Sequence, residues 1–550
     1  GVNAGNSIES GGNYNTVVGD EAGTAITTGD NNTALGYAAG TAVTTGVNNT
    51  IIGGLAGDAQ TTANNNTAVG YQALSANTTG SQNIAIGRSA LAANTSASNS
   101  VAVGNSALAA NTTGTQNVAM GAVSLDANTE GDNNVALGYG ALSANTTADD
   151  NVAIGRTAME TNTTGTANVA VGKDALLANT TASNNTAVGF DALTANTTGT
   201  RNTAVGKNAG LSATTGDDNT FIGQDSGDAV TTASDNTAVG SYSLTNTTTG
   251  DNNVAIGYAA LEANTTGTNN TIIGSLAGDA LTVGTRNVAV GKSALSADTQ
   301  GSRSVAVGRS ALQTQNFTSA TNAYNVAVGD FAGFAVTTGV NNTIVGGLAG
   351  DAITTGDYNV ALGMTTLSTN TAANKNVAIG AQALADFNVT SDTDTYNVAV
   401  GYAAGAAVTT GTFNTLIGGL AGDANTTGER NTAVGQQSFS TNTTGSYNTV
   451  LGRSALFSNT TAPNNTAVGY EALYANTTGT INTALGRQAL ANNTTGTDNT
   501  AVSYSLVTNT TGIQNTAVGV SALNANTTGS YNTAVGREAL KSNTTGTFNV

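Results

Sequence analysis

The strongest constraint on the fold of this chain is a short motif that recurs at a nearly fixed interval. The motif, close to N-[TV]-A-[VIL]-G, begins at Asn15 and recurs to Asn532, and Asn549 begins one more copy. Of the 31 complete copies, 28 have 17 residues, two have 21 and one has 16, and no linker separates them. The sequence therefore predicts one continuous array over residues 15–550, preceded by a partial coil at 1–14.

The length of the repeat selects a parallel β-solenoid. We number the positions 1 to 17 on the typical copy NTAVGYQALSANTTGSQ, residues 66–82. This unit is too short for a helical hairpin, and its glycines and β-branched residues disfavour helix. We expect a strand at positions 1–4 turned by Gly70, a second strand at positions 7–11, and a turn at positions 13–15 where Gly80 supplies a positive φ. Stacking at about 4.8 Å would align the position-1 asparagines in a hydrogen-bonded ladder.

Two kinds of copy show how the coils pack. Most copies have leucine at position 9, but ten have glycine there, and position 12 is then usually apolar. We infer that positions 9 and 12 share one core whose volume is conserved. Position 4 is always apolar, and position 3 is large in six glycine-type copies. Both faces of the strand thus accept apolar side chains, which predicts several rods packed side by side, most simply as a parallel homotrimer.

Composition excludes several functions. The chain has no histidine and no cysteine, so Ser-His-Asp or Cys-His catalysis, imidazole or thiolate metal sites and disulfides are excluded. The coils are also too short and regular to form a catalytic cleft. We therefore predict no enzyme activity, no cofactor and no metal. A net charge of −18 argues against nucleic acid. No apolar stretch approaches the roughly 20 residues of a membrane span.

The motif N-[TV]-A-[VI]-G-x-x-[AS] closely resembles the head repeat of trimeric autotransporter adhesins, NSVAIG followed by x-x-S. The run Ser100–Ala107, SVAVGNSA, is among the nearest matches. The repeat is also similar to those of long phage tail fibres and bacterial surface fibres. The resemblance covers nearly the whole chain and implies a trimer of left-handed parallel β-rolls that projects from a surface. This chain departs from the family in its longer period, and we expect it to be a segment of a longer or processed fibre.

Together these features predict a non-enzymatic, extracellular fibrous protein. It would form the rod or head of a surface adhesin, a tail fibre or a filament that mediates attachment at a cell or virion surface. The expected partners are further copies of the chain, as a homotrimer or longer filament, and a surface glycan or receptor. The alternative is a single-chain β-helix that binds polysaccharide or ice along a flat repetitive face.

The two 21-residue copies, 304–324 and 376–396, are the best local candidates for recognition. Each carries four extra residues before the next asparagine, and loops on a rigid scaffold commonly carry function. Acidic and aromatic residues on a protruding turn suit sugar hydroxyls or a calcium ion bridging to a glycan. The opposing interpretation is a tolerated insertion at a turn. The candidate residues are Phe317, Tyr324, Asp386, Phe387, Asp392, Asp394 and Tyr396.

Three other recurrent features have structural interpretations that we favour. The NTT run at positions 12–14 is an N-glycosylation sequon, but it also suits a turn with a threonine ladder. Aspartate recurs at position 10 of glycine-type copies, where a solvated or capping role is expected rather than calcium binding. Tyrosine recurs at position 6 and at the last position of a copy, where it would cover a strand edge or stack on sugar rings.

Overall fold

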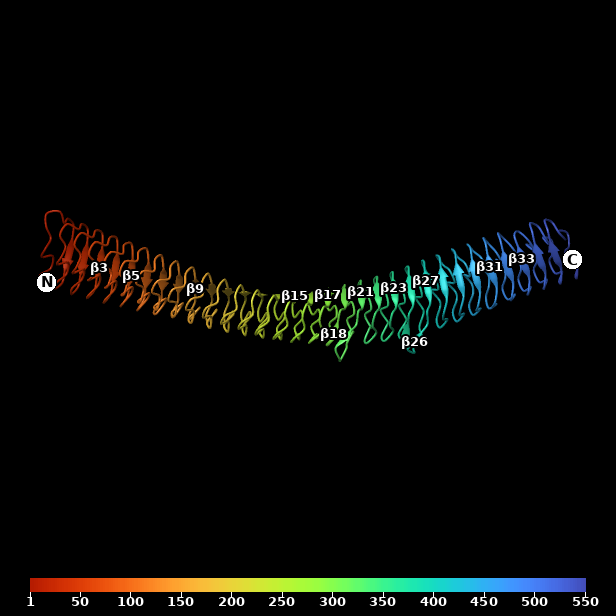
Figure 1. Ribbon diagram of the computed structural model, residues 1–550, viewed down its shortest axis with the longest axis horizontal. Helices are drawn as coiled ribbons and strands as arrows, with labels where there is room; N and C mark the ends of the chain where they lie inside the picture. Colours follow the sequence, from red (N-terminus) through yellow and green to blue (C-terminus); the bar gives the residue numbers. More distant parts are fainter. The chain divides into compact units, whose positions relative to one another are not determined.

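The computed structural model describes residues 1–550 and is an all-β parallel solenoid of about 31 turns without a helix. The chain divides into two compact units, Gly1–Asn270 and Thr271–Val550. Within each unit, one short strand per coil lies beside the strand of the next coil (Figure 1). The predicted β-solenoid with 17-residue coils is confirmed.

The first unit contains fifteen strands, each of three residues. They are β1 (Thr16–Val18), β2 (Thr33–Leu35), β3 (Thr50–Ile52), β4 (Thr67–Val69), β5 (Ile84–Ile86), β6 (Val101–Val103), β7 (Val118–Met120), β8 (Val135–Leu137), β9 (Val152–Ile154), β10 (Val169–Val171), β11 (Thr186–Val188), β12 (Thr203–Val205), β13 (Thr220–Ile222), β14 (Thr237–Val239) and β15 (Val254–Ile256).

The second unit contains sixteen equivalent strands and four shorter ones. The equivalent strands are β16 (Thr271–Ile273), β17 (Val288–Val290), β19 (Val305–Val307), β21 (Val326–Val328), β22 (Thr343–Val345), β23 (Val360–Leu362), β25 (Val377–Ile379), β27 (Val398–Val400), β28 (Thr415–Ile417), β29 (Thr432–Val434), β30 (Thr449–Leu451), β31 (Thr466–Val468), β32 (Thr483–Leu485), β33 (Thr500–Val502), β34 (Thr516–Val518) and β35 (Thr533–Val535). The two-residue strands are β18 (Gly301–Ser302), β20 (Thr321–Asn322), β24 (Ala373–Asn374) and β26 (Thr393–Asp394).

Each three-residue strand occupies positions 2 to 4 of its coil. In β4 and β5, Thr67 pairs with Ile84, and the register is parallel with like positions opposite each other. The middle residue, Ala68, points inward and is fully buried, while Thr67 and Val69 are only half-buried on the outer face. The sheet therefore presents a filled inner face and an outer face that the chain leaves uncovered.

The predicted second strand at positions 7–11 is wrong. The backbone there forms two turns, closed by hydrogen bonds from Ala73 N to Gly70 O (3.3 Å) and from Asn77 N to Leu74 O (3.3 Å). Gln72 and Leu74 adopt φ values of 56° each, in the left-handed region that non-glycine residues seldom occupy. Because the turns fold positions 8, 9 and 12 inward together, this segment fills the core without a second sheet.

The role predicted for the glycine at position 15 is also wrong. Gly80 does not have a positive φ, but a Cβ there would lie 2.1 Å from Ala97 O of the next coil. Close approach of neighbouring backbones, rather than conformation, therefore favours a small residue. At position 5 both reasons apply, because Gly70 has φ 134° and an added Cβ would lie 2.5 Å from Gly87 O.

The predicted ladder of position-1 asparagines is confirmed. Asn83 N donates to Asn66 Oδ1 (2.8 Å), and Asn66 Nδ2 donates to Gly80 O of its own coil (2.9 Å). A second ladder, at position 12, was not anticipated. Asn94 Nδ2 donates to the Oδ1 of Asn77 (3.0 Å), one coil earlier, and these side chains are fully buried. Two buried amide ladders thus link successive coils, and most of their polar groups are hydrogen-bonded, with Asn196 Oδ1 and Asn264 Oδ1 as exceptions.

The structure confirms that positions 9 and 12 share one core, and side chains of neighbouring coils fill the same space. Beside Gly23, a Cβ would lie 2.7 Å from Val17 and 2.9 Å from Ile26, at positions 3 and 12 of the same coil. Phe221 shows the wider pattern, because its ring fills the space beside Gly227 in its own coil and Gly210 in the preceding one. A large residue at position 3 thus replaces leucines missing from two consecutive coils.

Candidate recognition surface

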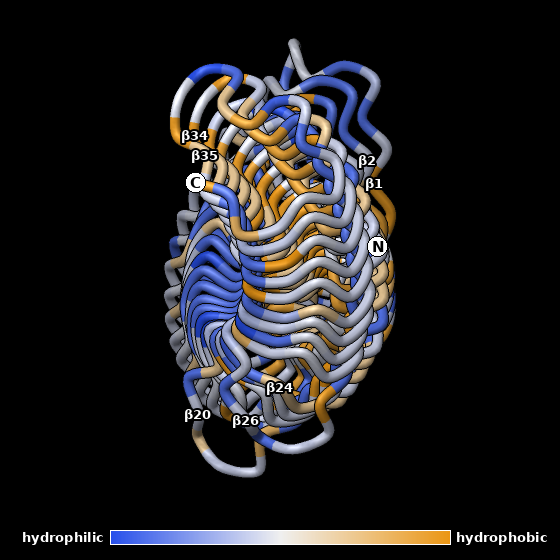
Figure 2. The backbone as a smooth tube through the Cα atoms, turned by 90° about the vertical axis from the view of Figure 1, so that its right-hand side faces the viewer, coloured by the Kyte–Doolittle hydropathy of each residue, from blue (hydrophilic) through white to orange (hydrophobic).

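The two 21-residue copies extend at one edge of the coils. In each, the extra residues form a loop that returns as a two-residue strand, β20 pairing with β18 and β26 with β24. Figure 2 shows β20 and β26 at the same edge of the second unit. Residues 318–320 and 390–393 form the exposed parts of these loops. The coils before and after each insert retain the regular strand pairing.

Phe317 and Phe387, two of the aromatic candidates, do not belong to a recognition surface. Phe387 is fully buried at position 12, and Phe317 is 6% exposed. Phe387 keeps the register of the coil, so its ring enters the core at position 12. Phe317 lies at position 14, which is exposed in regular coils, and is buried here where its amide donates to Asp298 Oδ1 (3.2 Å). This corrects the expectation that both rings would be available to a ligand.

The acidic candidates of the second insert are held by the preceding coil. Lys375 Nζ lies 2.5 Å from Asp394 Oδ2 and 3.2 Å from the Tyr396 hydroxyl. Asn374 Nδ2 donates to Asp392 Oδ1 (2.6 Å). The Lys375 ammonium holds the pKa of the Asp394 carboxyl below its ordinary value. These contacts fix the loop and bring Asp392, Asp394 and Tyr396 together.

The remaining two candidates are exposed at separate places. Asp386 lies at position 11, before the loop, and has an exposed side chain. Tyr324 is 48% exposed, and the Arg303 guanidinium lies 5.4 Å from its ring centroid. Tyr324 and Tyr396 are the last residues of the two 21-residue copies and correspond to position 17 of the regular copies, so they belong to one row along the second unit. Four of the seven candidates therefore lie near this row: Asp392, Asp394 and Tyr396 at the second insert, and Tyr324 at the end of the first. The other three, Phe317, Asp386 and Phe387, lie apart from it.

A buried carboxylate lies beneath the first insert. Asp298 is fully buried at position 12 and accepts hydrogen bonds from Gln315 Nε2 (2.7 Å), Gly301 N (2.9 Å) and Phe317 N (3.2 Å). Gln315 also donates to Ser304 Oγ (2.9 Å), where serine interrupts the position-1 ladder. The network therefore joins the two ladders at the coil where both depart from asparagine.

Burial makes the protonation of Asp298 relevant to stability. Desolvation raises the pKa of this carboxyl, despite the opposing effect of its hydrogen-bond donors. Its pKa in the unfolded chain is near 3.8. Protonation of Asp298 therefore adds to the free energy of unfolding. This contribution is fully present below pH 3.8 and is lost as the pH rises through the higher pKa that Asp298 has in the folded state. Desolvation likewise raises the pKa of the half-buried position-10 carboxyls Asp58, Asp228 and Asp351.

Position 17 carries an exposed row of aromatic and cationic side chains in the second unit. From coil to coil the row reads Arg303, Tyr324, Asn341, Tyr358, Lys375, Tyr396, Phe413, Arg430 and Tyr447. Every one of these residues has a φ between 49° and 64°, so the side chains leave the coils in the same way. The five rings are 44–55% exposed. We call these nine residues the aromatic row.

Contacts within the aromatic row hold its rings in place. Tyr396 stacks on Phe413, with ring centroids 5.8 Å apart and planes inclined by 22°. The Arg430 guanidinium lies 5.2 Å from the Phe413 centroid and 5.5 Å from that of Tyr447, and Lys375 Nζ lies 5.3 Å from that of Tyr396. Such contacts each contribute about 0.5–1 kcal/mol at exposed sites. The rings therefore form a partly ordered surface.

The recurrent tyrosines were expected from the sequence, whereas the continuous row was not. The signal lies in the same position read across all copies. In the complete coils of the first unit, position 17 holds amides, acids, one alanine and one arginine, and no aromatic residue. The aromatic row is therefore visible in the sequence when the last residues of successive copies are compared with each other.

A second exposed feature is the outer face of the strands. Position 4 is apolar in every coil, and its side chains remain partly exposed, for example Val18 (52%), Leu35 (44%), Met120 (43%), Leu362 (42%) and Leu451 (48%). They lie in a regular row in each unit, since the parallel register places like positions side by side. Such a row is larger than the scattered exposed apolar residues usual on a monomer.

The NTT segments form a different surface. Asn77 is fully buried and its amide donates to Gly80 O, so this sequon asparagine belongs to the core ladder. Thr78 and Thr79 are both exposed. The Thr78 hydroxyl donates to Thr95 O of the next coil (3.0 Å), which ties the position-13 hydroxyls to the backbone.

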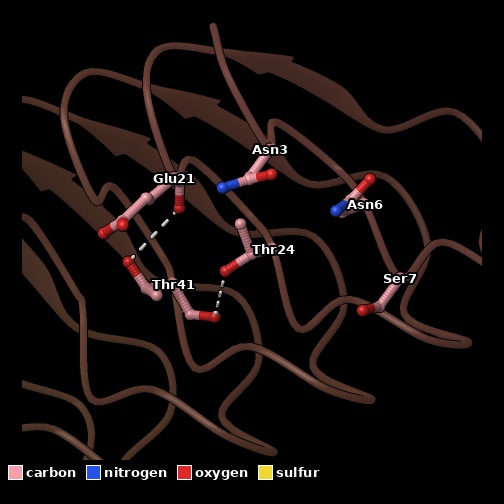
Figure 3. A pocket seen from close by; sticks show the side chains of 6 residues that line it. All are labelled: Asn3, Asn6, Ser7, Glu21, Thr24 and Thr41. Carbon is pink, nitrogen blue, oxygen red and sulfur yellow. Dashed lines mark hydrogen bonds between the residues drawn. The ribbon is translucent and has the colours of Figure 1, made fainter.

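One open hollow lies near the start of the chain. Asn3, Asn6, Ser7, Glu21, Thr24 and Thr41 line it (Figure 3). Thr41 Oγ1 donates to Glu21 O, and Thr24 Oγ1 donates to Thr41 O, each at 3.4 Å. Its single carboxylate has no neighbouring acid or base in the lining, so it offers no pair for acid–base chemistry.

The structure contains no cluster of three acidic, histidine or cysteine side chains that could hold a metal ion. It also contains no helix that could cross a membrane. Comparison with protein-family models and with curated proteins found no match.

Proposed function

We propose that this protein is a non-enzymatic fibrous protein of an extracellular, cell or virion surface, whose copies assemble as a parallel homotrimer that mediates attachment. The observation that carries the proposal is the row of exposed apolar side chains at position 4. Val18, Leu35 and Met120 are each more than 40% exposed in the first unit, although this position is apolar in all copies. Burial of such side chains contributes about 25 cal/mol per Å² of apolar area.

A second copy fits this face better than an unrelated partner does. Each copy carries the same row at the same coil spacing, so two chains aligned in parallel present matching rows over many coils. A closed ring leaves no apolar face uncovered, and three chains form the smallest ring in which every chain contacts both others. The resemblance to trimeric adhesin and tail-fibre repeats supports the same arrangement.

Light scattering of the purified chain tests the assembly. We expect a mass about three times the chain mass of 53.8 kDa. Leu35→Lys with Ile86→Lys places charges on the position-4 row and should lower the mass, whereas Thr79→Lys with Thr113→Lys, on the exposed position 14, should not. A folded wild-type chain of 53.8 kDa would overturn the trimer.

The second candidate function is a single-chain β-helix that binds polysaccharide or ice along a repetitive face. The exposed threonines at position 14, such as Thr79 and Thr113, favour a flat polar face, and the aromatic row favours a polysaccharide. A monomeric mass together with binding to either ligand would support this alternative. Attachment of the chain to cells, measured with and without glycosidase treatment of the surface, tests the adhesive role directly.

A further inference from the structure

We propose that the aromatic row of the second unit binds an extended, neutral polysaccharide lying parallel to the stack of coils. This inference rests on the attachment function proposed above and names the class of ligand and the surface that holds it. The binding rings are Tyr324, Tyr358, Tyr396, Phe413 and Tyr447.

The spacing of the rings fits a chain of sugars. Tyr324, Tyr358 and Tyr396 follow each other at intervals of two coils, and Phe413 and Tyr447 are also two coils apart. Two coils correspond to about 10 Å at the usual strand spacing, which is close to the length of a disaccharide in an extended chain. From Tyr324 to Tyr447 the row spans seven coils, or roughly 34 Å by the same spacing. Tyr396 and Phe413 are one coil apart, so the rings form two sets, and Tyr324, Tyr358 and Tyr396 can contact successive disaccharides in register.

The chemistry of the row favours sugar rings. Aromatic faces stack on the apolar C–H faces of sugars, while hydroxyl groups need polar partners nearby. Asn341 lies within the row, the Tyr396 hydroxyl contacts Lys375 and Asp394, and the exposed loops at 318–320 and 390–393 emerge at the same edge. The row thus combines half-exposed rings with hydroxyl, amide and carboxylate groups.

The local charge favours a neutral chain over an acidic one. The Lys375 ammonium pairs with Asp394 (2.5 Å), and the Arg430 guanidinium pairs with Glu429 (2.8 Å). Asp357 and Asp392 add further negative charge near the row. Because the whole chain has a net charge of −18, a polyanionic glycan would be repelled. An extended β-1,4-linked chain of uncharged hexoses is the best fit.

The first unit supplies a conservative substitution for the test. Position 17 there is most often asparagine, and this residue tolerates the left-handed backbone that each copy requires. Tyr358→Asn with Tyr396→Asn should therefore remove two rings without disturbing the coils. Tyr37→Asn with Tyr71→Asn, which removes exposed tyrosines at position 6 of the first unit, is the matched control.

The probes are cellohexaose and chitohexaose, with dextran and heparin for comparison, and binding to the full chain is measured by calorimetry. We expect one of the β-1,4-linked hexasaccharides to bind, the row variant to weaken binding roughly tenfold or more, and the control to leave it unchanged. Light scattering and circular dichroism should show the same mass and fold for all three proteins.

Several outcomes would overturn the proposal. These are no binding of either hexasaccharide, equal binding by wild type and row variant, tighter binding of heparin, or a change of mass in the row variant, which would make the row a subunit interface. Cell attachment tests the attachment function independently of polysaccharide binding. Cell attachment that persists in the row variant would retain that function and reject this surface, whereas absence of attachment in the wild type would reject the function.

Discussion

Phe221 allows a test of core packing. The effect of Gly227→Leu on local stability should be opposite in the wild type and in a Phe221→Ala variant. The ring is fully buried in β13. A Cβ on Gly227 would lie 2.4 Å from the ring, and one on Gly210 would lie 2.7 Å from it. Phe221→Ala should therefore open a cavity and destabilise the local coils by about 3–5 kcal/mol.

Gly227→Leu should behave oppositely in the two backgrounds. In the wild type the new side chain overlaps the Phe221 ring, which should destabilise the coil by at least 1–3 kcal/mol, the usual cost of overpacking. With Phe221→Ala present, the same leucine fills the cavity and stacks on Leu244, the position-9 leucine of the next coil. The backbone permits this, because Gly227 has φ 60° and Leu244 has φ 54°.

Hydrogen exchange measures the local effect, since a repeat array does not unfold as a single two-state unit. The reporters are the amides of Gly227, which donates to Ser243 O (3.0 Å), and of Gly210, which donates to Ser226 O (2.9 Å). The distant Gly70 amide serves as an internal control. If Gly227→Leu lowers protection equally with and without Phe221, the two positions do not share a volume and the proposed exchange between coils is refuted.

Three further predictions concern the ladders and the inserts. Asp298→Asn should raise stability at pH 7 and flatten its rise toward acidic pH, because the raised pKa of this carboxyl makes its contribution fall as pH increases; thermal melts from pH 3 to 8 measure both effects. Asn111→Ala leaves the Asn128 amide without its 2.9 Å acceptor, so exchange at neighbouring amides should report a local loss of about 1–3 kcal/mol, and unchanged protection would contradict a role for the ladder. Deletion of residues 389–392 should leave the thermal melt of the regular coils intact, and a chain that fails to fold would show that the second insert is structural.

The sequence was sufficient to predict the strand, the ladder and the core because their signals repeat in every copy. In stacked coils, asparagine at position 1 of every copy can form a hydrogen-bonded ladder, and alanine at position 3 can point into the core. The turns over positions 6–11 could not be predicted, since nothing in the residue types of Gln72 and Leu74 favours left-handed backbone. Such backbone costs about 1–2 kcal/mol per residue, and tertiary hydrogen bonds override that local preference. Phe387 was misassigned although a count from Asn376 places it at position 12, a core position.

The left-handed residues explain why a coil depends on its neighbours. Gly70, Gln72 and Gln82 donate their amides to carbonyl groups of the preceding coil, and Leu74 donates to the following one. The amides at all four positive-φ positions of the coil therefore donate their hydrogen bonds to another coil. An isolated coil would still have the free-energy cost of the left-handed backbone but would lack these hydrogen bonds. Interior positions are constrained by these bonds, by the amide ladders and by shared core volume.

The outer positions 17, 2, 4 and 6 are free of most of these constraints, so differences in function between parts of the array should be found there. Position 4 is apolar in every copy, which suits an interface with another copy of the chain, whereas position 2 is threonine, valine or isoleucine. Position 17 carries no aromatic residue in the complete coils of the first unit, whereas aromatic and cationic residues predominate between Arg303 and Tyr447 of the second, while the backbone conformation stays the same. A change of chemistry on an unchanged backbone is expected when a surface is selected for a ligand rather than for folding, and this favours the aromatic row over the regular coils as the proposed ligand-binding surface.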